Sequence, residues 1–186
     1  MIDIVLRDRK PDQWYVEPFA GNMDTIYNVQ GNRIANDADP HYISMWREFL
    51  KGWVPELITK ETYWDVKRDE YAYTNTLRWW VRYYCNDSAG RFSMYHQAKA
   101  LAEIIGRVEG LRGTILRNAD FLSLEVPANS LIYFGPPRHI KYVTLWDYVR
   151  TCAKQGHTVF VKRSTAPKDF RCVWSRNKAE KLFTLR

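Results

Sequence analysis

The sequence predicts an α/β fold in which helices cover both faces of a sheet and the chain closes with an antiparallel hairpin. Short apolar segments with strand character alternate with segments of helical spacing, which is typical of an α/β sheet. The chain has 186 residues, of which 46% are hydrophobic, so it has enough apolar side chains for one compact core. Two strand segments near the end, separated by a short turn, predict the hairpin.

The chain begins with strands and continues into a helix. Residues 14–19 and 32–36 are short and apolar, and both are expected to be buried strands. Asp39 precedes Pro40, which is a strong signal for a helix start because Asp caps the free N–H groups and proline tolerates the first turn. This helix is expected to continue to about Lys51.

A helical region follows in the middle of the chain. Thr59 can cap a further turn or helix, and residues 70–85 have the spacing of an amphipathic helix. The polar run at 86–90 interrupts it, and residues 92–109 predict another helix. The apolar side expected for that helix consists of Ala98, Leu101, Ala102, Ile105 and Val108.

The last part returns to the alternation of strands and helices. Strands are expected near 114–116 and 130–134, and a helix near 144–154. Residues 158–162 and 171–174 are expected to pair as a hairpin across a turn rich in Pro, Lys and Asp, with a final strand near 179–185.

Charge is unevenly distributed along the chain. Residues 1–77 contain 9 Lys and Arg against 13 Asp and Glu, whereas residues 138–186 contain 12 against 3. A strongly basic last quarter in a chain of net charge +7 suits a surface that faces a polyanion. An ordinary solvated surface is the alternative reading of the charge alone.

Some classes of protein are not expected. The three cysteines, Cys85, Cys152 and Cys172, show no paired or His-linked spacing, so they predict small buried side chains and no metal site. The first ten residues do not resemble a signal peptide, and no apolar run approaches the ~20 residues of a membrane span. We expect no membrane partner and a cytoplasmic location.

Three stretches, taken in their order and spacing, resemble the phage-type (Dam-like) DNA adenine methyltransferases. Residues 14–21, Trp-Tyr-Val-Glu-Pro-Phe-Ala-Gly, are similar to the first cofactor motif, a strand ending in E/D-P-F-x-G-G. Residues 32–40 are similar to the next strand and its terminal acid, and residues 127–137 to the catalytic strand that ends in D-P-P-Y. The resemblance implies a Rossmann-like methyltransferase sheet, in which the helices at about 70–112 form an insert in the place of the target-recognition region of a single domain.

The resemblance implies that the catalytic motif is degenerate, because it is Gly-Pro-Pro-Arg in this chain. In the family, the Asp accepts a hydrogen bond from the amine of a flipped adenine, and the Tyr stacks on that base. Gly135 stands at the Asp position and cannot accept this bond, and Arg138 replaces the aromatic ring. Only Pro136 and Pro137 match. We therefore expect no catalytic residue.

The resemblance also implies a weakened cofactor site. Glu17 and Asp37 match the family's acids, Asp37 being the one that holds ribose hydroxyls, and Gly21 matches the first of two loop glycines. The second glycine is missing, and the first ten residues contain no Tyr-x-Gly-x-Lys segment. We expect these three residues to be vestigial, and S-adenosylmethionine binding to be lost.

These observations predict a phage-encoded, non-catalytic protein that binds double-stranded DNA with little sequence preference. Arg78 and Arg82 lie four residues apart and share a helix face, beside Trp79 and Tyr83. The residues expected to contact DNA are Arg78, Arg82, Arg91, Arg138, Lys141, Lys162, Arg163 and Lys168. The alternatives are an active adenine methyltransferase with atypical motifs, and a protein-interaction or decoy module that acts on a host enzyme. A homodimer is possible, and a protein partner is not excluded.

Overall fold

The computed structural model describes residues 1–185, which form two compact units. One unit combines Met1–Ala38 with the segment from Gly113 onward, and the other consists of Asp39–Arg112. The helical unit therefore begins at residue 39, earlier than the insert at about 70–112 that the sequence predicts. The reason is that the helix starting at Pro40 packs against the helix starting at Asn75.

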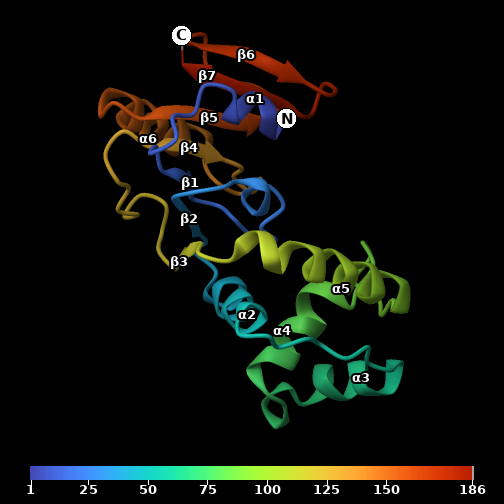
Figure 1. Ribbon diagram of the computed structural model, residues 1–186. Helices are drawn as coiled ribbons and strands as arrows, with labels where there is room; N and C mark the ends of the chain where they lie inside the picture. The colour runs from blue at the N-terminus through green and yellow to red at the C-terminus, as the bar shows by residue number, and fades with distance from the viewer. Residues whose placement is uncertain (186) are drawn as a thin grey trace. The chain divides into compact units, whose positions relative to one another are not determined.

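The first unit is built on a seven-stranded sheet with the order β3-β2-β1-β4-β5-β7-β6 (Figure 1). The strands β1 to β5 are mutually parallel. The order 3-2-1-4-5 is that of a doubly wound Rossmann sheet, and it reverses between β1 and β4. The Rossmann-like α/β fold is thus confirmed. The strand bounds are β1 Tyr15–Glu17, β2 Arg33–Asn36, β3 Ile115–Arg117, β4 Leu131–Phe134, β5 Thr158–Arg163, β6 Phe170–Ser175 and β7 Lys181–Leu185.

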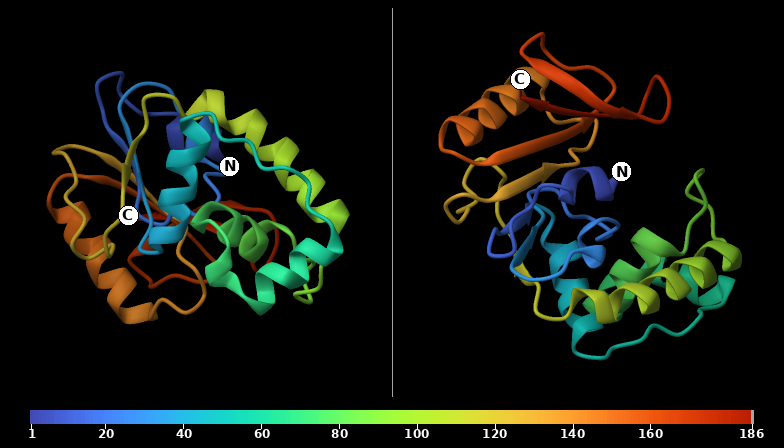
Figure 2. Two further views of the ribbon diagram at one scale, coloured as in Figure 1. Left: turned by 90° about the horizontal axis from the view of Figure 1, so that it is seen from below. Right: turned by 45° about the horizontal axis from the view of Figure 1, so that its top comes forward.

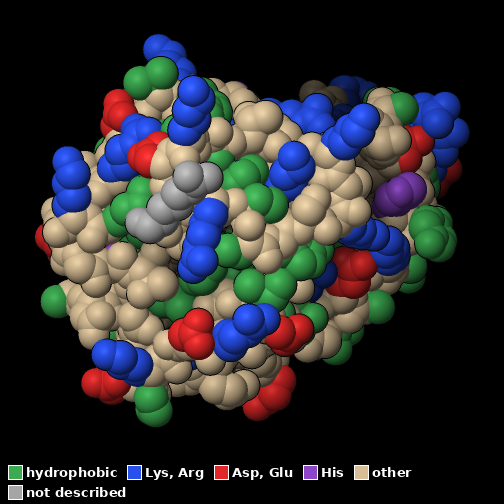
Figure 3. Space-filling view, turned by 90° about the horizontal axis from the view of Figure 1, so that it is seen from above, with side chains coloured by type: hydrophobic (Ala, Val, Ile, Leu, Met, Phe, Trp, Pro, Cys, Tyr) green, Lys and Arg blue, Asp and Glu red, His purple; other side chains and the backbone are tan. Residues whose placement is uncertain are grey.

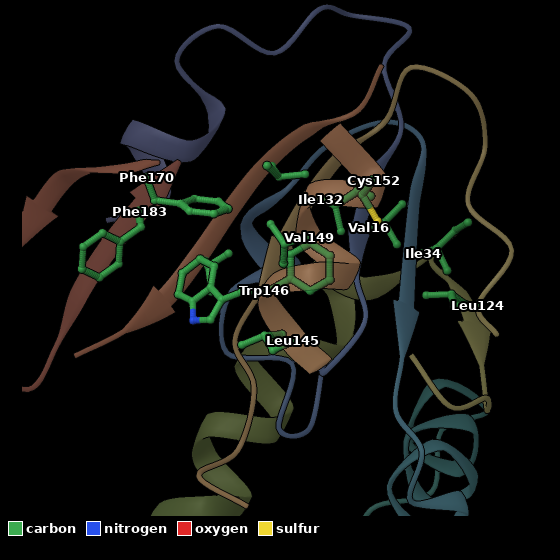
Figure 4. Packing of buried hydrophobic residues seen from close by; sticks show 13 residues of the cluster. Val16, Ile34, Leu124, Ile132, Leu145, Trp146, Val149, Cys152, Phe170 and Phe183 are labelled. Carbon is green, nitrogen blue, oxygen red and sulfur yellow. The ribbon is translucent and has the colours of Figure 1, made fainter. Parts of the chain in front are cut away.

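One face of this sheet is covered by α6, Tyr142–Lys154. Figure 4 shows Trp146 and Val149 of this helix against side chains of the strands. Alternate residues of the strands, such as Val16 and Ile132, point to the same face and are fully buried. Successive side chains of a strand point to opposite faces of a sheet, so every second residue faces α6. The hydrophobic core of the unit therefore lies between α6 and the strands.

The opposite face is covered by the N-terminal segment, so helices lie on both faces. Tyr133 of β4 points to this second face, and its hydroxyl lies 3.8 Å from Sδ of Met1. Met1 precedes α1, Ile2–Leu6, whose Val5 is buried. A 3-10 turn, η1 at Ile26–Asn28, follows β1 with its Ile26 also buried. α1 was not predicted from the sequence.

The hairpin at the end of the chain pairs different strands from those expected. β5 pairs with β7 and not with β6, and the antiparallel hairpin is formed by β6 and β7. The expected pairing of residues 158–162 with 171–174 is therefore wrong. β7 contributes the buried Leu182 and Phe183, whereas Phe170 is the one buried residue among the six of β6. β7 therefore takes the inner position, and β6 becomes the edge.

The second unit consists of helices (Figure 2). Its two predicted helix starts are confirmed. The carboxylate of Asp39 accepts a hydrogen bond from the backbone N–H of His41, and the hydroxyl of Thr59 accepts one from the backbone N–H of Thr62. α4 contacts the three other long helices of the unit. The helix bounds are α2 Pro40–Leu50, α3 Lys60–Arg68, η2 Glu70–Ala72, α4 Asn75–Tyr84, α5 Met94–Val108 and η3 Glu109–Leu111.

The buried side of α5 differs from the expected one. Gln97 and Ile104 are its buried side chains, whereas Ala98, Ala102 and Ile105 are exposed. The side-chain amide of Gln97 donates to the carbonyl of Ile58 at 2.8 Å, and its oxygen accepts from the N–H of Ile58 at 3.0 Å. This polar contact, which hydrophobic spacing does not reveal, selects the inward side of the helix.

Cysteine burial also departs from expectation at one position. Cys85 and Cys152 are buried, but Cys172, on the edge strand β6, is exposed. Within residues 1–185 no group of His, Cys, Asp or Glu side chains is arranged to hold a metal ion. Within the same residues, no helix has the length and apolar character needed to span a membrane.

Candidate nucleic-acid interface

The carboxyl ends of β1, β2, β4 and β5 meet at the edge of the sheet where Rossmann-like folds bind their ligands. Glu17 is the last residue of β1 and is only 3% exposed. The hydroxyl of Tyr15 donates a hydrogen bond of 2.6 Å to its carboxylate. Burial raises the pKa of Glu17 to about 8. Its carboxyl group is thus part of the interior of the unit.

The loop after β1 is fastened to the end of β2. The N–H of Gly21 donates to the carboxylate of Asp37 at 2.9 Å, and the N–H of Ala20 donates to the carbonyl of Asn36 at 2.8 Å. Gly21 adopts a left-handed backbone with φ of 44°, which glycine tolerates better than other residues. Asp37 therefore contacts the loop that the resemblance assigns to the cofactor.

Asn36, the last residue of β2, joins three segments at this edge. Its side chain is fully buried. The amide nitrogen donates to the carbonyls of Pro18 and Ala119, at 3.0 and 2.9 Å, and the oxygen accepts from the N–H of Ala119 at 3.0 Å. This role of Asn36 was not predicted from the sequence. The available signal was a polar residue that ends an apolar strand, since a buried amide needs hydrogen-bond partners.

β4 ends at the Gly135-Pro136-Pro137-Arg138 segment. Gly135 has no side chain, and a Cβ atom added there would meet the Tyr133 ring at 3.5 Å, an ordinary contact distance. The position could therefore accept a larger residue without disturbing the strand. Pro137 and Arg138 are exposed. Nothing in this segment can accept a hydrogen bond through a carboxylate.

A pocket of about 490 Å³ lies at the ends of β4 and β5. Three of its lining residues are cations, and none is an acid. The lining residues are Gly135, Pro136, Arg138, Lys162, Arg163, Ser164 and Ala179. The pocket thus combines the degenerate motif with the basic end of β5, and its chemistry suits an anion.

The three cations of this pocket differ in how they are held. Arg138 is exposed. Nζ of Lys162 lies 2.6 Å from the carboxylate of Glu180, which already offsets part of its charge. Nη2 of Arg163 donates to the carbonyl of Ile140 at 3.1 Å, and burial lowers the pKa of Arg163. Its Nε is buried without a hydrogen-bond partner among the described residues.

The remaining DNA-contact candidates lie elsewhere. Lys141 caps the start of α6 and Lys168 lies between β5 and β6, and both are exposed. Arg78, Arg82 and Arg91 belong to the helical unit, and the Arg91 guanidinium is paired with Asp87 at 2.9 Å. The structure therefore brings together only Arg138, Lys162 and Arg163 in one pocket of the sheet unit.

Figure 3 looks onto the C-terminal hairpin, where Lys and Arg side chains are spread over the visible face with Asp and Glu beside some of them. Two ion pairs of the sheet unit join a cation to an acid. Arg150 pairs with Asp169 at 2.7 Å, and Arg176 lies 3.8 Å from Glu180. The positive charge of this face is thus partly balanced.

No model of a protein family matches this chain, and no curated protein matches it. Among solved structures, it is similar to the crystal structure of SMU.472, provisionally described as a methyltransferase and complexed with SAH, with a TM-score of 0.42 and 12% identity over 99% of this chain. The chain spans 51% of that structure's length. The Rossmann-like fold itself follows from the strand order of the sheet.

Proposed function

We propose that this chain binds double-stranded DNA through its phosphates, largely without sequence preference, and transfers no methyl group. The observation that carries the proposal is the pocket at the ends of β4 and β5, where Arg138, Lys162 and Arg163 surround the position of Gly135. Lys and Arg contacts to phosphates supply affinity but do not discriminate between base sequences.

The absence of methyl transfer follows from the chemistry of the motif. If the chain derives from adenine methyltransferases, the base amine needs an acceptor at position 135, and glycine provides none. Asp37 contacts Gly21, and Glu17 is buried against Tyr15, so both retained acids have partners within the fold. S-adenosylmethionine is accordingly not part of the proposal.

The experiment is a titration of a random-sequence duplex with the full chain at about 50 and 200 mM salt. Five basic residues of the sheet unit are candidates for contact, and each phosphate contact contributes a slope of roughly 0.9 in log affinity against log salt. Affinity should therefore fall about 500-fold over this range. The five residues are Arg138, Lys141, Lys162, Arg163 and Lys168.

Incubation with labelled S-adenosylmethionine and an adenine-containing duplex is the companion experiment. Methylation above background would favour the active-enzyme alternative. Duplex binding that is weak and insensitive to salt would favour a protein-interaction module, since phosphate contacts always release counterions.

A further inference from the structure

A second pocket, of about 210 Å³, lies within the helical unit beside α4. From it we infer that the helical unit binds one unpaired nucleotide, whose base stacks on aromatic rings while two arginines meet its phosphates. The inference rests on the proposed function, because it assumes a nucleic-acid ligand. The pocket is lined by His41, Glu70, Tyr71, Arg78, Trp79 and Arg82.

Three aromatic side chains line the pocket, and none of them is fully buried. The rings of His41 and Trp79 lie 5.1 Å apart with an interplanar angle of 34°. Tyr71 is 85% exposed, and the guanidinium of Arg78 lies 5.4 Å from the centre of its ring. Aromatic rings and an arginine plane around one hollow are the usual means of holding an unstacked base.

The two arginines remain available for a ligand, unlike most cations of this unit. Among the described residues, neither Arg78 nor Arg82 forms an ion pair, and Nε of Arg78 is buried without a hydrogen-bond partner. Arg78 donates only to the side-chain oxygen of Asn75 in this conformation. In contrast, six other cations pair with an acid three or four residues away: Lys51, Arg68, Arg91, Lys99, Arg107 and Arg112.

Size and charge favour a base over an acidic peptide. At about 210 Å³, the pocket suits one flat ring system better than a base pair. Glu70 also lines the pocket. Its carboxylate would repel an acidic side chain, but it can accept from the N–H groups that every base has on its pairing edge.

The test compares two duplexes of the same sequence, one fully paired and one with a single unpaired nucleotide in its centre. Wild-type protein should bind the second duplex roughly 5- to 100-fold more tightly, the range expected for one stacked base. Tyr71→Ala and Trp79→Ala should abolish this preference and leave the affinity for the paired duplex unchanged. Trp79→Phe should keep most of it, because phenylalanine can still stack.

The matched control is Trp64→Ala, since Trp64 is 49% exposed in the same unit but does not line the pocket. It should behave as wild type. Equal wild-type affinity for both duplexes would overturn the inference and leave the proposed function intact. Failure to bind either duplex would overturn both. A poly-glutamate peptide could also displace the duplex that contains the unpaired nucleotide, when added at the same total negative charge. That result would overturn the inference and would indicate a protein ligand.

Discussion

The carboxylate of Asp37 accepts a hydrogen bond of 2.9 Å from the backbone N–H of Gly21. The two residues stand at the ends of neighbouring strands, and both match positions that the family resemblance assigns to a cofactor. In this chain their contact holds the loop after β1 against the end of β2. We therefore expect Asp37 to contribute to folding rather than to ligand binding.

Asp37→Ala should lower the free energy of unfolding by about 1 kcal/mol, because it leaves a partly buried N–H without its acceptor. Urea denaturation measures this change. Asp12→Ala is the control, since Asp12 is exposed on the same unit. A variant as stable as wild type would contradict a structural role for Asp37.

Gly135→Asp should fold normally and still transfer no methyl group. An added Cβ atom meets the Tyr133 ring at an ordinary distance, but Arg138 still replaces the aromatic residue and the Gly21 loop is still held by Asp37. Thermal unfolding and labelled methyl transfer are the two measurements. Methylation by this variant alone would mean that the rest of the active site is intact, contrary to the proposal.

Arg138→Ala should weaken duplex binding more than Lys162→Ala does. Arg138 is exposed, whereas Lys162 is already paired with Glu180 at 2.6 Å. The first substitution should lower the slope of log affinity against log salt by about one. All duplex sequences should be affected equally. A larger effect from Lys162→Ala would show that its pairing with Glu180 opens on binding.

Glu180→Gln should increase duplex affinity and steepen its salt dependence. The change removes the negative charge that pairs with Lys162 and approaches Arg176, so Lys162 becomes available for one more phosphate. Glu103→Gln in α5 removes the same charge outside the sheet unit and serves as the control. Equal gains in both variants would indicate a general charge effect instead of this contact.

Glu17 should make the protein less stable as the pH rises. Its pKa is about 8 in the folded state against 4.5 as its ordinary value, so the folded protein keeps a proton that the unfolded chain releases. The free energy of unfolding should fall between these pH values, by at most ~1.4 kcal/mol per unit.

Glu17→Gln should remove this slope and be more stable than wild type at pH 8, since its amide oxygen can still accept from Tyr15. Denaturation at pH 5, 6.5 and 8 gives the comparison, with the exposed Glu56→Gln as control. Parallel pH profiles for wild type and Glu17→Gln would refute the assignment.

Sequence reasoning performed well where a local signal determines the structure. Asp39 and Thr59 cap helices as expected because a cap depends only on residues within one turn. The predictions were wrong where contacts between residues distant in the sequence determine which side of an element is buried. The buried side of α5 depends on the contact between Gln97 and Ile58, 39 residues apart in the chain.

The candidate site was predictable in part. Arg138, Lys162 and Arg163 share one pocket because the parallel strands β4 and β5 end at the same edge. Their partners were not predictable. Glu180 reaches Lys162 only because β7 pairs with β5, and the sequence favoured β6 in that place.

The position of β7 between β5 and β6 also sets an order of assembly. During synthesis β6 emerges first, yet among the described strands it pairs only with β7, which follows it. β6 therefore has no strand to pair with until β7 has been synthesised. β6 joins the sheet through β7, so changes that slow the turn at 176–180 should delay the addition of β6.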